Sequence, residues 1–535
     1  MKKNRILGMV LAGVMMAGVL AACAPTAPPA PTAPPAQQPA AQPTAPTAPT
    51  VAPPVVDEIE LGRTIIVATQ NEPPSIAPAR HNAVAGSYMN AMHFNALFRT
   101  DAFTLLPVPD LVASWEAISD TVFEFTIHEG VLFHNGEEMT ADDIVASFDY
   151  VRNYPDARVS RESIVEYEAV GRYTVRINTE TPNAMLFADL THQGNMIMPA
   201  SLIAQGHDFN VQPVGSGPFV FEEWRMGDSI TSSNHHDYFD RERASRVEGV
   251  IWRTIPEGAS RTIALETGEI DYNQYVSFED IARLQATDGI EVSMVTGTSH
   301  NVMYINHERP QFANIYARRA IDMAIDKEAL SIAGFNGFSI PVWSQAPVIF
   351  EGSTTVGANS FDPEGARALL AEHGIDPATL EFTNIASNEE RRRMSEVMQA
   401  NLADIGITMH IEMNDLATTL ERTIGGDYEA GMGGFNSATF LGYVRGTFHI
   451  NGIDASNRSR GVHQEMSDLI DLALATTDQN ARIAMYTEIN RMANEFTLSI
   501  PTHQAMVVKA FNSNLIVPET PATGALGLNM MFWNN

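Results

Sequence analysis

A low-complexity stretch over residues 24–56, almost entirely Ala, Pro, Thr and Gln with Val towards its end, cannot bury a hydrophobic core. Its composition favours a semi-extended, polyproline-like conformation, which makes the segment a tether. The chain that follows, from about Leu61, holds about 475 residues, which is more than one hydrophobic core organises. The sequence therefore predicts a tether followed by a body of two or more domains.

The residues before the tether are typical of an export signal. Basic residues stand at positions 2, 3 and 5, an apolar run follows from Ile6 to Leu20, and the run ends in Leu20-Ala21-Ala22-Cys23. This order predicts a signal peptide over residues 1–22, and the apolar run is shorter than the roughly 20 residues of a membrane-spanning helix. The L-A-A-C ending resembles the lipobox of bacterial lipoproteins, which implies that Cys23 is acylated. We therefore expect a lipid anchor at Cys23 and a tether over residues 23–60.

The charge of the chain excludes one class of partner. Its net charge is −31, with 33 Lys and Arg against 64 Asp and Glu. Such a surface lacks the basic face that nucleic-acid phosphates require, and it repels anionic lipid headgroups. We therefore expect no nucleic-acid partner and no membrane contact except through the lipid anchor. Cys23 is the only cysteine, so the chain forms no intramolecular disulfide.

Hydrophobic periodicity predicts a mixed α/β body. Apolar residues are consecutive or alternate over 64–68, 121–128 and 173–177, which predicts strands there. Thr140-Ala141-Asp142-Asp143 has the pattern of a capping box, so a helix is expected to begin at this point. The second half is richer in helices, predicted over 314–332, 362–374, 394–406, 463–475 and 479–495, with a strand over 407–413 and one or two strands over 499–511.

Two clusters invite a chemical interpretation, and both have a simpler structural one. Asp142 and Asp143 suit a catalytic carboxylate pair, but carboxylates in the first turn of a helix meet unpaired backbone amides, which favours capping. His235-His236-Asp237 lacks a third ligand at a suitable spacing, which favours a structural loop over a metal site. The sequence contains no zinc-protease, penicillin-binding or hydrolase-elbow motif. We therefore expect no catalysis, no metal and no cofactor.

Several segments resemble the family 5 extracellular solute-binding proteins, a group of bacterial receptors for dipeptides, oligopeptides, nickel and some oligosaccharides. The most specific segment is FEFTIHEGVLFHNG over 123–136. The other segments follow in the order typical of the family, at 74–78, 109–116, 139–145, 213–219, 265–271 and 317–327. Each segment alone is a weak signal, and their common order and spacing carry the resemblance.

The resemblance implies an α/β fold of the periplasmic-binding-protein type, with two lobes, a ligand cleft between them, a two-stranded hinge and an extra subdomain in the first lobe. It also implies the substrate-binding component of an ABC importer. This monomer would capture an extracellular oligopeptide outside the cytoplasm and deliver it to membrane permease subunits. The implied domains are 61–105, 213–300 and 499–535 for domain I, 106–212 for domain II, and 301–498 for domain III.

The resemblance further implies ligand-binding residues. The family's G-W-x-x-D-like segment corresponds here to Gly434-Phe435-Asn436-Ser437-Ala438, in which Phe435 replaces the tryptophan and Ala438 stands nearest the position of the acid. That acid often pairs with the free α-amino group of a peptide, so its absence argues against dipeptide recognition through a free N-terminus. The remaining candidates are placed beside the implied cleft: His81, Asn82, Ser216, Asn301, Trp343 and Gln345.

Three other functions fit the sequence less well or equally. An oligosaccharide receptor of the same fold would stack sugars on aromatic rings and bind hydroxyls through amides, and Phe435, Asn436, Trp343 and Gln345 suit this role. A secreted hydrolase would need a nucleophile, a metal triad or paired acids, and none stands out. A receptor that signals ligand binding without transport would have the same sequence features.

Replacing Cys23 with Ser removes the thiol that acylation requires. We expect the Cys23→Ser protein to move from the membrane to the soluble fraction, because stable anchoring requires more than one acyl chain. Membrane and soluble fractions of cells expressing each protein, washed with salt and compared by immunoblot, measure the change. A Cys23→Ser protein that stays on washed membranes would contradict the lipid anchor.

Overall fold

The computed structural model describes residues 61–78, 80, 84–153, 163–437, 439–476 and 478–534. All of them belong to one compact unit that spans Val51–Asn535. The predicted signal peptide, Cys23 and most of the tether lie outside the described residues. None of the described helices is long and apolar enough to cross a membrane.

One sheet of eleven strands runs through the described residues. Its order is β15 (Met409–Met413), β14 (Phe382–Ala386), β16 (Ala430–Phe435), β12 (Ile290–Ile305), β17 (Ser499–Asn512), β11 (Tyr272–Asn273), β1 (Ile65–Thr69), β10 (Gly249–Thr254), β9 (Ser229–Asn234) and β8 (Phe219–Arg225), and β13 (Ser339–Pro341) pairs with β17. The strands β12 and β17 are the longest, with 16 and 14 residues. They pair antiparallel from Ile290 opposite Asn512 to Tyr304 opposite Ser499.

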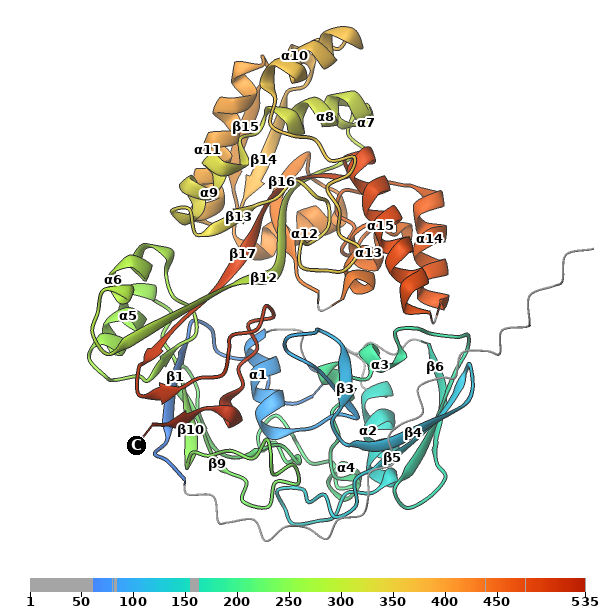
Figure 1. Cartoon of the computed structure of the whole chain (residues 1–535), viewed down its shortest axis with the longest axis vertical. Helices are drawn as coiled ribbons and strands as arrows, with labels where there is room; N and C mark the ends of the chain where they lie inside the picture. Colours follow the sequence, from blue (N-terminus) through green and yellow to red (C-terminus); the bar gives the residue numbers. More distant parts are fainter. Residues whose placement is uncertain are drawn as a thin grey trace, which may run out of the picture. The chain divides into compact units, whose positions relative to one another are not determined.

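The strands β12 and β17 connect two lobes, as Figure 1 shows. At one end β12 pairs with β16, and at the other end β17 pairs with β11. We call the part with β1 and β8–β11 the first lobe, and the part with β14–β16 the second lobe. The register of the β12–β17 pair shifts between Thr296 and His300 and again after Asn301, between the two ends. The predicted α/β fold with two lobes and a two-stranded connection is confirmed.

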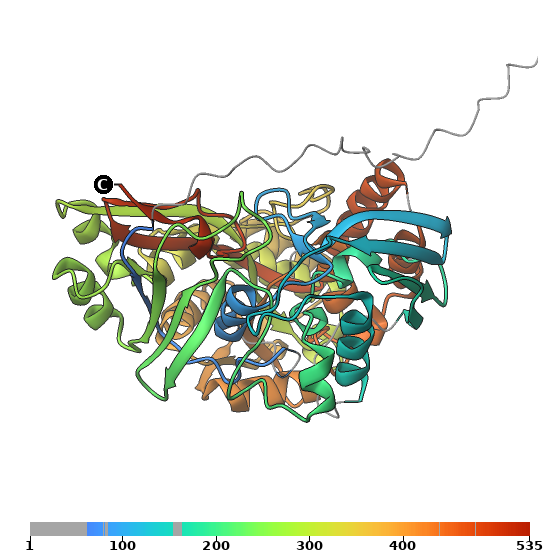
Figure 2. The same cartoon turned by 90° about the horizontal axis from the view of Figure 1, so that it is seen from below.

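The first lobe also contains a separate four-stranded sheet. Its order is β4 (Val112–Ser119), β5 (Val122–Ile127), β7 (Thr174–Thr179) and β6 (Ile164–Ala169), and it packs on α2 (Ala141–Arg152) around Phe125, Phe148 and Val175. This sheet lies on the side of the lobe away from the C-terminal residues (Figure 2). Shorter elements complete the lobe: α1 (Val84–His93), β2 (Phe98–Thr100), β3 (Pro107–Pro109), α3 (Leu186–Asp189), α4 (Ala200–Ala204), α5 (Gly258–Glu266), α6 (Ile281–Gln285), β18 (Leu515–Ile516) and β19 (Phe532–Trp533).

The capping interpretation of Thr140 and Asp143 is confirmed. The backbone N–H of Thr140 donates to Asp143 Oδ2 at 2.7 Å, and the backbone N–H of Ala200 donates to the other carboxylate oxygen at 2.8 Å. Asp143 therefore stabilises the first turn of α2 and holds the start of α4 against it. Ile144, Phe148 and Val151 follow at helical spacing and are buried, as the apolar periodicity predicts.

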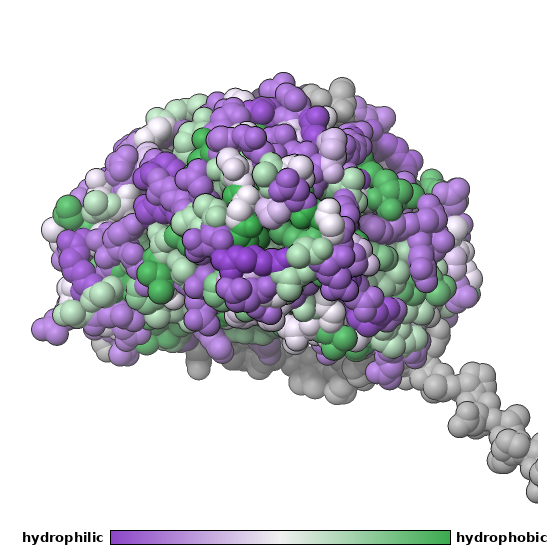
Figure 3. Space-filling view, turned by 90° about the horizontal axis from the view of Figure 1, so that it is seen from above, coloured by the Kyte–Doolittle hydropathy of each residue, from purple (hydrophilic) through white to green (hydrophobic). Residues whose placement is uncertain are grey.

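Helices cover the second lobe. They are α7 (Pro310–Ala313), α8 (Ile315–Ala324), α9 (Lys327–Phe335), α10 (Pro363–Glu372), α11 (Glu389–Asp404), α12 (Leu416–Gly425), α13 (Phe440–Thr447), α14 (Gln464–Ala475) and α15 (Gln479–Phe496). One cluster around Ile321 and Met398 packs α8–α11 against the sheet, and a second around Val444 and Ile489 packs α13–α15 together. Polar side chains cover most of the face that Figure 3 shows, as the composition requires.

Most predicted helices and strands of the second lobe are present, and one is wrong. The single helix expected over 314–332 is two helices, because α8 ends at Ala324 and Ile325 adopts an extended conformation (φ −93°, ψ 119°). The side chain of Asp326 then accepts from the backbone N–H groups of Glu328 and Ala329 and begins α9. The apolar periodicity continues across this break, so it concealed the capping residue.

A buried ion pair joins the two helices at this break. Lys327 Nζ lies 2.9 Å from Asp322 Oδ1, and each side chain is 1% exposed. Asn359 Nδ2 donates to the other oxygen of Asp322 at 2.9 Å. A buried charge without its partner costs much more than the pair contributes, so each member depends on the other.

Replacing Lys327 with Met leaves the Asp322 carboxylate buried without its counter-ion. We expect Lys327→Met to lower the free energy of unfolding by about 3–5 kcal/mol, and Asp322→Asn combined with Lys327→Met to restore much of the loss. Urea denaturation measures both. The control is Arg367→Met, which breaks the exposed pair with Glu364 and should cost less than about 1 kcal/mol. Equal losses in Lys327→Met and Arg367→Met would contradict the assignment.

Candidate ligand-binding cleft

Three adjoining cavities meet at Asn436 and Ser437, the two residues that follow β16. Ser437 lines a cavity of about 590 Å³ and shares a second, of about 540 Å³, with Asn436. Asn436 also lines a third cavity of about 400 Å³. Because both lobes contribute to each cavity, the three form a cleft that follows the boundary between the lobes.

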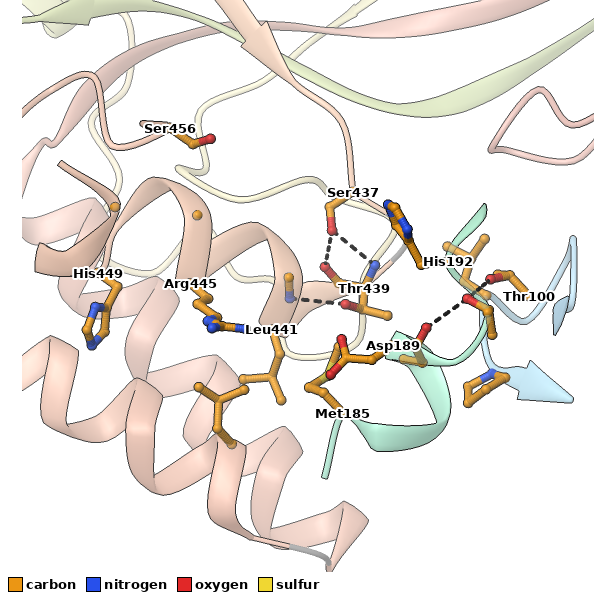
Figure 4. Close-up of a pocket in the computed structure, with 18 of the residues that line it drawn as sticks. Thr100, Met185, Asp189, His192, Ser437, Thr439, Leu441, Arg445, His449 and Ser456 are labelled. Atoms are coloured by element: carbon orange, nitrogen blue, oxygen red, sulfur yellow. Dashed lines mark hydrogen bonds between the residues drawn. The ribbon is translucent and has the colours of Figure 1, made fainter. Parts of the chain in front are cut away.

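The largest cavity, which we call the α13 cavity, lies where the first lobe faces the start of α13. Met185, Asp189 and His192 line it from the first lobe, and Ser437, Thr439 and Arg445 line it from the second lobe (Figure 4). Thr439 Oγ1 accepts from the backbone N–H of Gly442 at 3.0 Å and caps α13, while Ser437 Oγ donates to Thr439 O at 2.9 Å. The cap therefore fixes the direction of the chain between β16 and α13.

The two lobes touch directly beside the α13 cavity. Leu105 of the first lobe is 9% exposed and belongs to the hydrophobic cluster of α13–α15. Its backbone adopts the left-handed conformation, with φ 59°, which is uncommon for leucine. The backbone N–H of Ala184 in the first lobe donates to Leu474 O in the second lobe at 2.9 Å. These two contacts hold the edge of the cleft opposite the connecting strands.

The second cavity, which we call the middle cavity, contains charged groups of the first lobe. Arg243 Nη1 lies 2.8 Å from Asp110 Oδ1, and Asn95 Nδ2 donates to the other oxygen of Asp110 at 3.0 Å. Arg99 also lines this cavity, and it makes no hydrogen bond or ion pair with a described residue. Burial lowers the pKa of Arg99, and the nearby Arg243 lowers it further. The middle cavity therefore offers a cation to a ligand.

The third cavity, which we call the hinge-side cavity, lies against β12 and β17. Gln70, Tyr88 and Tyr275 line it from the first lobe, Lys509 lines it from β17, and Asn436 lines it from the second lobe. Tyr88 Oη donates to Gly524 O at 2.9 Å, and burial raises the pKa of Tyr88. Burial also lowers the pKa of Lys509 to about 7. The wall combines aromatic surface with a few polar groups, as ligand pockets usually do.

The model of the middle region of bacterial extracellular solute-binding proteins, family 5, matches residues 107–443. This chain belongs to that family. Over 85% of its length it is 25% identical to di/tripeptide-binding protein 2 of Pseudomonas aeruginosa, and the match covers 92% of that relative. The family is one of extracellular solute-binding proteins. A cleft between two lobes is a common place for a small-molecule site, which makes the three cavities the candidate site here.

Solved structures of other binding proteins share this fold. The binding protein DppA of Helicobacter pylori in complex with the peptide STSA matches with a TM-score of 0.78 at 22% identity, over 89% of this chain and 99% of that chain. NikA of Brucella suis in complex with Fe(III)-EDTA matches with a TM-score of 0.80 at 21% identity, over 88% of this chain and 100% of that chain. At these identities the likeness establishes the architecture of the two lobes.

The segment predicted from the family's G-W-x-x-D-like motif divides into two parts. Asn436 and Ser437 line the cleft, and Asn436 accepts a hydrogen bond from the hydroxyl of Thr298. Gly434 and Phe435 stand behind them, because Phe435 packs on Tyr443 with the ring centres 5.8 Å apart. The roles of these four residues in ligand binding stay predictions. The role of Asn301, a residue of β12 that stands opposite Gly434, also stays a prediction.

Three other candidates do not line the three cavities and make internal contacts instead, although the partner of Ser216 lines the middle cavity. Ser216 is buried and donates to Asn95 Oδ1 at 3.0 Å. Gln345 is buried, donates from Nε2 to Ser499 O at 2.8 Å and accepts from the hydroxyl of Ser499 at the same distance. The half-buried Trp343 has Lys327 Nζ 5.9 Å from its ring centre. His81 and Asn82 lie outside the described residues.

Sequence reasoning missed the basic residues of the cleft, among them Arg99 and Lys509, which form no ion pair with a described residue. Arg99 has no distinctive sequence context, since it lies in a three-residue strand before a loop. The sequence context of Lys509 is distinctive. It is one of four lysines in the chain, and it falls inside the apolar strand predicted over 499–511. A charged residue within a run that should be buried marks a site that needs a partner.

The predicted histidine cluster is part of the first lobe. His235 Nδ1 lies 2.9 Å from Gly217 O, and its ring packs edge-on against that of His134. Burial lowers the pKa of His134 to about 4. Among the residues that the structure describes, no group of three or more His, Cys, Asp or Glu side chains is arranged to hold a metal.

Gly434 allows β16 to approach β12 closely behind the cleft. A Cβ atom at this position would lie 2.4 Å from Asn301 Oδ1 and 3.0 Å from His300 O. We expect Gly434→Ala to lower the free energy of unfolding by about 1–3 kcal/mol, because the strands must separate or Asn301 must move. The control is Gly425→Ala at the end of α12, where no atom lies within 4 Å. Urea denaturation that gives equal stability for both variants would contradict the close approach.

Proposed function

We propose that this chain is the substrate-binding component of an ABC importer and captures an extracellular oligopeptide between its two lobes. The observation that carries the proposal is the row of three cavities that meet at Asn436 and Ser437. A row of cavities along a lobe boundary suits an extended chain better than a compact molecule. The peptide-binding relatives, among them the dipeptide-binding protein of Escherichia coli at 23% identity, support this choice of ligand.

A cleft of this kind favours binding through the peptide backbone. Its polar groups include the amides of Gln70, Gln274 and Asn436 and the hydroxyl of Ser437, which suit backbone N–H and C=O groups. Recognition of the backbone tolerates varied side chains. We propose that the protein returns its ligand chemically unchanged, with closure of the lobes about β12 and β17 as the signal that the permease reads.

The location and organisation of the chain complete the proposal. Export through the signal peptide of residues 1–22 and acylation of Cys23 would hold a monomer at the outer surface of the cell membrane. The segment 23–60 would then act as a tether between the lipid and the binding lobes. Domains I, II and III, with the boundaries expected from the sequence, belong to the same proposal.

A peptide pool tests the proposed function. We expect the purified protein to capture members of a random pool of three- to five-residue peptides and to release them uncleaved, as measured by mass spectrometry before and after denaturation of the complex. Failure to capture any peptide, together with capture from a pool of gluco-oligosaccharides, would replace the peptide by a sugar. Cleaved peptides that persist after repurification of the protein would contradict a role in binding alone.

The charged groups of the cleft predict whether the protein prefers a peptide with a free N-terminus. The sequence has Ala438 nearest the position of the family's acid, and Arg99 and Lys509 place cations in two of the cavities. A buried α-ammonium group without a counter-ion costs several kcal/mol. We therefore expect the N-acetylated form of a captured peptide to bind at least as tightly as the form with a free amine, as measured by calorimetry. A tenfold preference for the free amine, about 1.4 kcal/mol, would contradict this expectation.

A further inference from the structure

Lys509 is buried in the wall of the hinge-side cavity without a counter-ion. It lies near the end of β17, where it stands opposite Ser293 of β12, and it is 2% exposed. Its Nζ makes no hydrogen bond or ion pair with a residue in the described part of the chain. The nearest ring is that of Tyr275, whose centre lies 5.3 Å from Nζ. The contact with an aromatic face compensates only part of the lost hydration of an ammonium group.

The direction of the Lys509 side chain follows from the alternation of β17. The neighbouring Val508 and Ala510 are buried in the cluster that α5 and α6 cover. Successive side chains of a strand point to opposite faces, so Lys509 points away from that cluster and towards the cavity. A Cβ atom placed on Gly524, at the far end of this wall, would lie 3.9 Å from Nζ.

The other lysine among the described residues, Lys327, shows what is missing. Lys327 is 2% exposed, like Lys509, and its Nζ lies 2.9 Å from the carboxylate of Asp322. Burying an ammonium group without such a partner costs several kcal/mol, and burial accordingly lowers the pKa of Lys509 to about 7. Lysine at this position therefore lowers stability in the empty protein, and a role with the ligand explains why the position holds one.

The other charged groups that line the hinge-side cavity are engaged or distant. The guanidinium of Arg261 donates to the backbone carbonyls of Ile255, Pro256 and Tyr275. Glu279 lies 3.8 Å from Arg393 of the second lobe. Glu390 lies in the first turn of α11, where the helix dipole favours a carboxylate, and it forms no ion pair with Lys509. The remaining ionisable side chains that line this cavity are those of Tyr88 and Tyr275.

We propose that Lys509 binds a carboxylate of the ligand in the hinge-side cavity. The proposal rests on the proposed function, since it assumes that a peptide occupies the cleft. A peptide presents a carboxylate at its C-terminus or on an Asp or Glu side chain, and either would supply the missing counter-ion. Pairing with the carboxylate stabilises the charged form of Lys509, so binding at a pH above its pKa draws a proton from solution. The ligand is thereby oriented with its anionic group against β17.

Three tripeptide pools separate the sources of the carboxylate. The first contains no Asp or Glu and has free C-terminal carboxylates, the second has the same sequences as C-terminal amides, and the third has amidated sequences that contain Glu. Capture is quantified by mass spectrometry. We expect the wild-type protein to capture the first or the third pool at least tenfold better than the second, and Lys509→Met to reduce this ratio to less than threefold. The pool that is captured best shows whether the C-terminus or a Glu side chain supplies the carboxylate.

Three further variants serve as comparisons. Lys509→Arg keeps the charge and should retain a preference for carboxylates. Arg99→Met removes the cation of the middle cavity, and Arg367→Met removes a cation from exposed α10. Arg367→Met should keep at least a tenfold ratio, because its side chain lies outside the three cavities. Arg99→Met tests the rival cation of the cleft, and its ratio should fall less than that of Lys509→Met. Loss of the ratio in Arg99→Met with its retention in Lys509→Met would overturn the assignment to Lys509.

Proton uptake on binding distinguishes a lysine that pairs with the ligand from a purely structural lysine, because a structural lysine would keep its protonation state. Calorimetry of the best-captured peptide at pH 8, in buffers with different ionisation enthalpies, should show uptake of close to one proton by the wild-type protein and none by Lys509→Met. Thermal unfolding checks that Lys509→Met folds, and Lys509→Gln replaces it if it does not. Equal capture of the carboxylate and amide pools by the wild-type protein would overturn the inference and leave the peptide function intact. Capture of none of the pools would overturn both.

Discussion

The antiparallel pairing of β12 with β17 is the constraint on which both lobes depend. The two strands belong to one sheet, so the sheet of the first lobe and that of the second lobe cannot slide past one another without breaking a shared ladder of hydrogen bonds. The register shifts between Thr296 and His300 and after Asn301 lie where this ladder is irregular. Irregularities of this kind bend strands, so they lie where a rotation of the lobes would disturb the fewest paired residues. Thr298 of the same stretch meets Asn436 of the cleft, so the bend and the ligand site are adjacent.

The buried charged side chains differ in whether they have a partner within the protein. Lys327 and Asp322 neutralise each other inside the second lobe, where a ligand has no access. Arg243 and Asp110 do the same at the wall of the middle cavity. Lys509 departs from this pattern, because its partner is absent from the described residues and its ammonium faces a cavity. The three cavities are lined by five acidic and five basic side chains, so the cleft is much less negative than the chain as a whole, whose net charge is −31.

The sequence predicted the fold better than the site, for physical reasons. Capping and periodicity depend on residues a few positions apart, so the box at Thr140 and the helix that begins at Asp362 were visible in the chain. The break at Asp326 was missed because the apolar stripe continues across it. The cleft depends on residues far apart in sequence. Motif comparison found the segment of Asn436, whereas Lys509 faces a cavity only because β17 places it there.

The contact of Leu105 with the second lobe contributes to how firmly the cleft stays shut. Opening exposes one leucine side chain, at about 1.5–3 kcal/mol, and breaks the hydrogen bond between Ala184 and Leu474, at about 1 kcal/mol. The balance is a few kcal/mol at most, the range in which a minor conformer stays populated. Contacts of this strength can break and re-form at equilibrium, so this edge of the cleft can separate without unfolding either lobe.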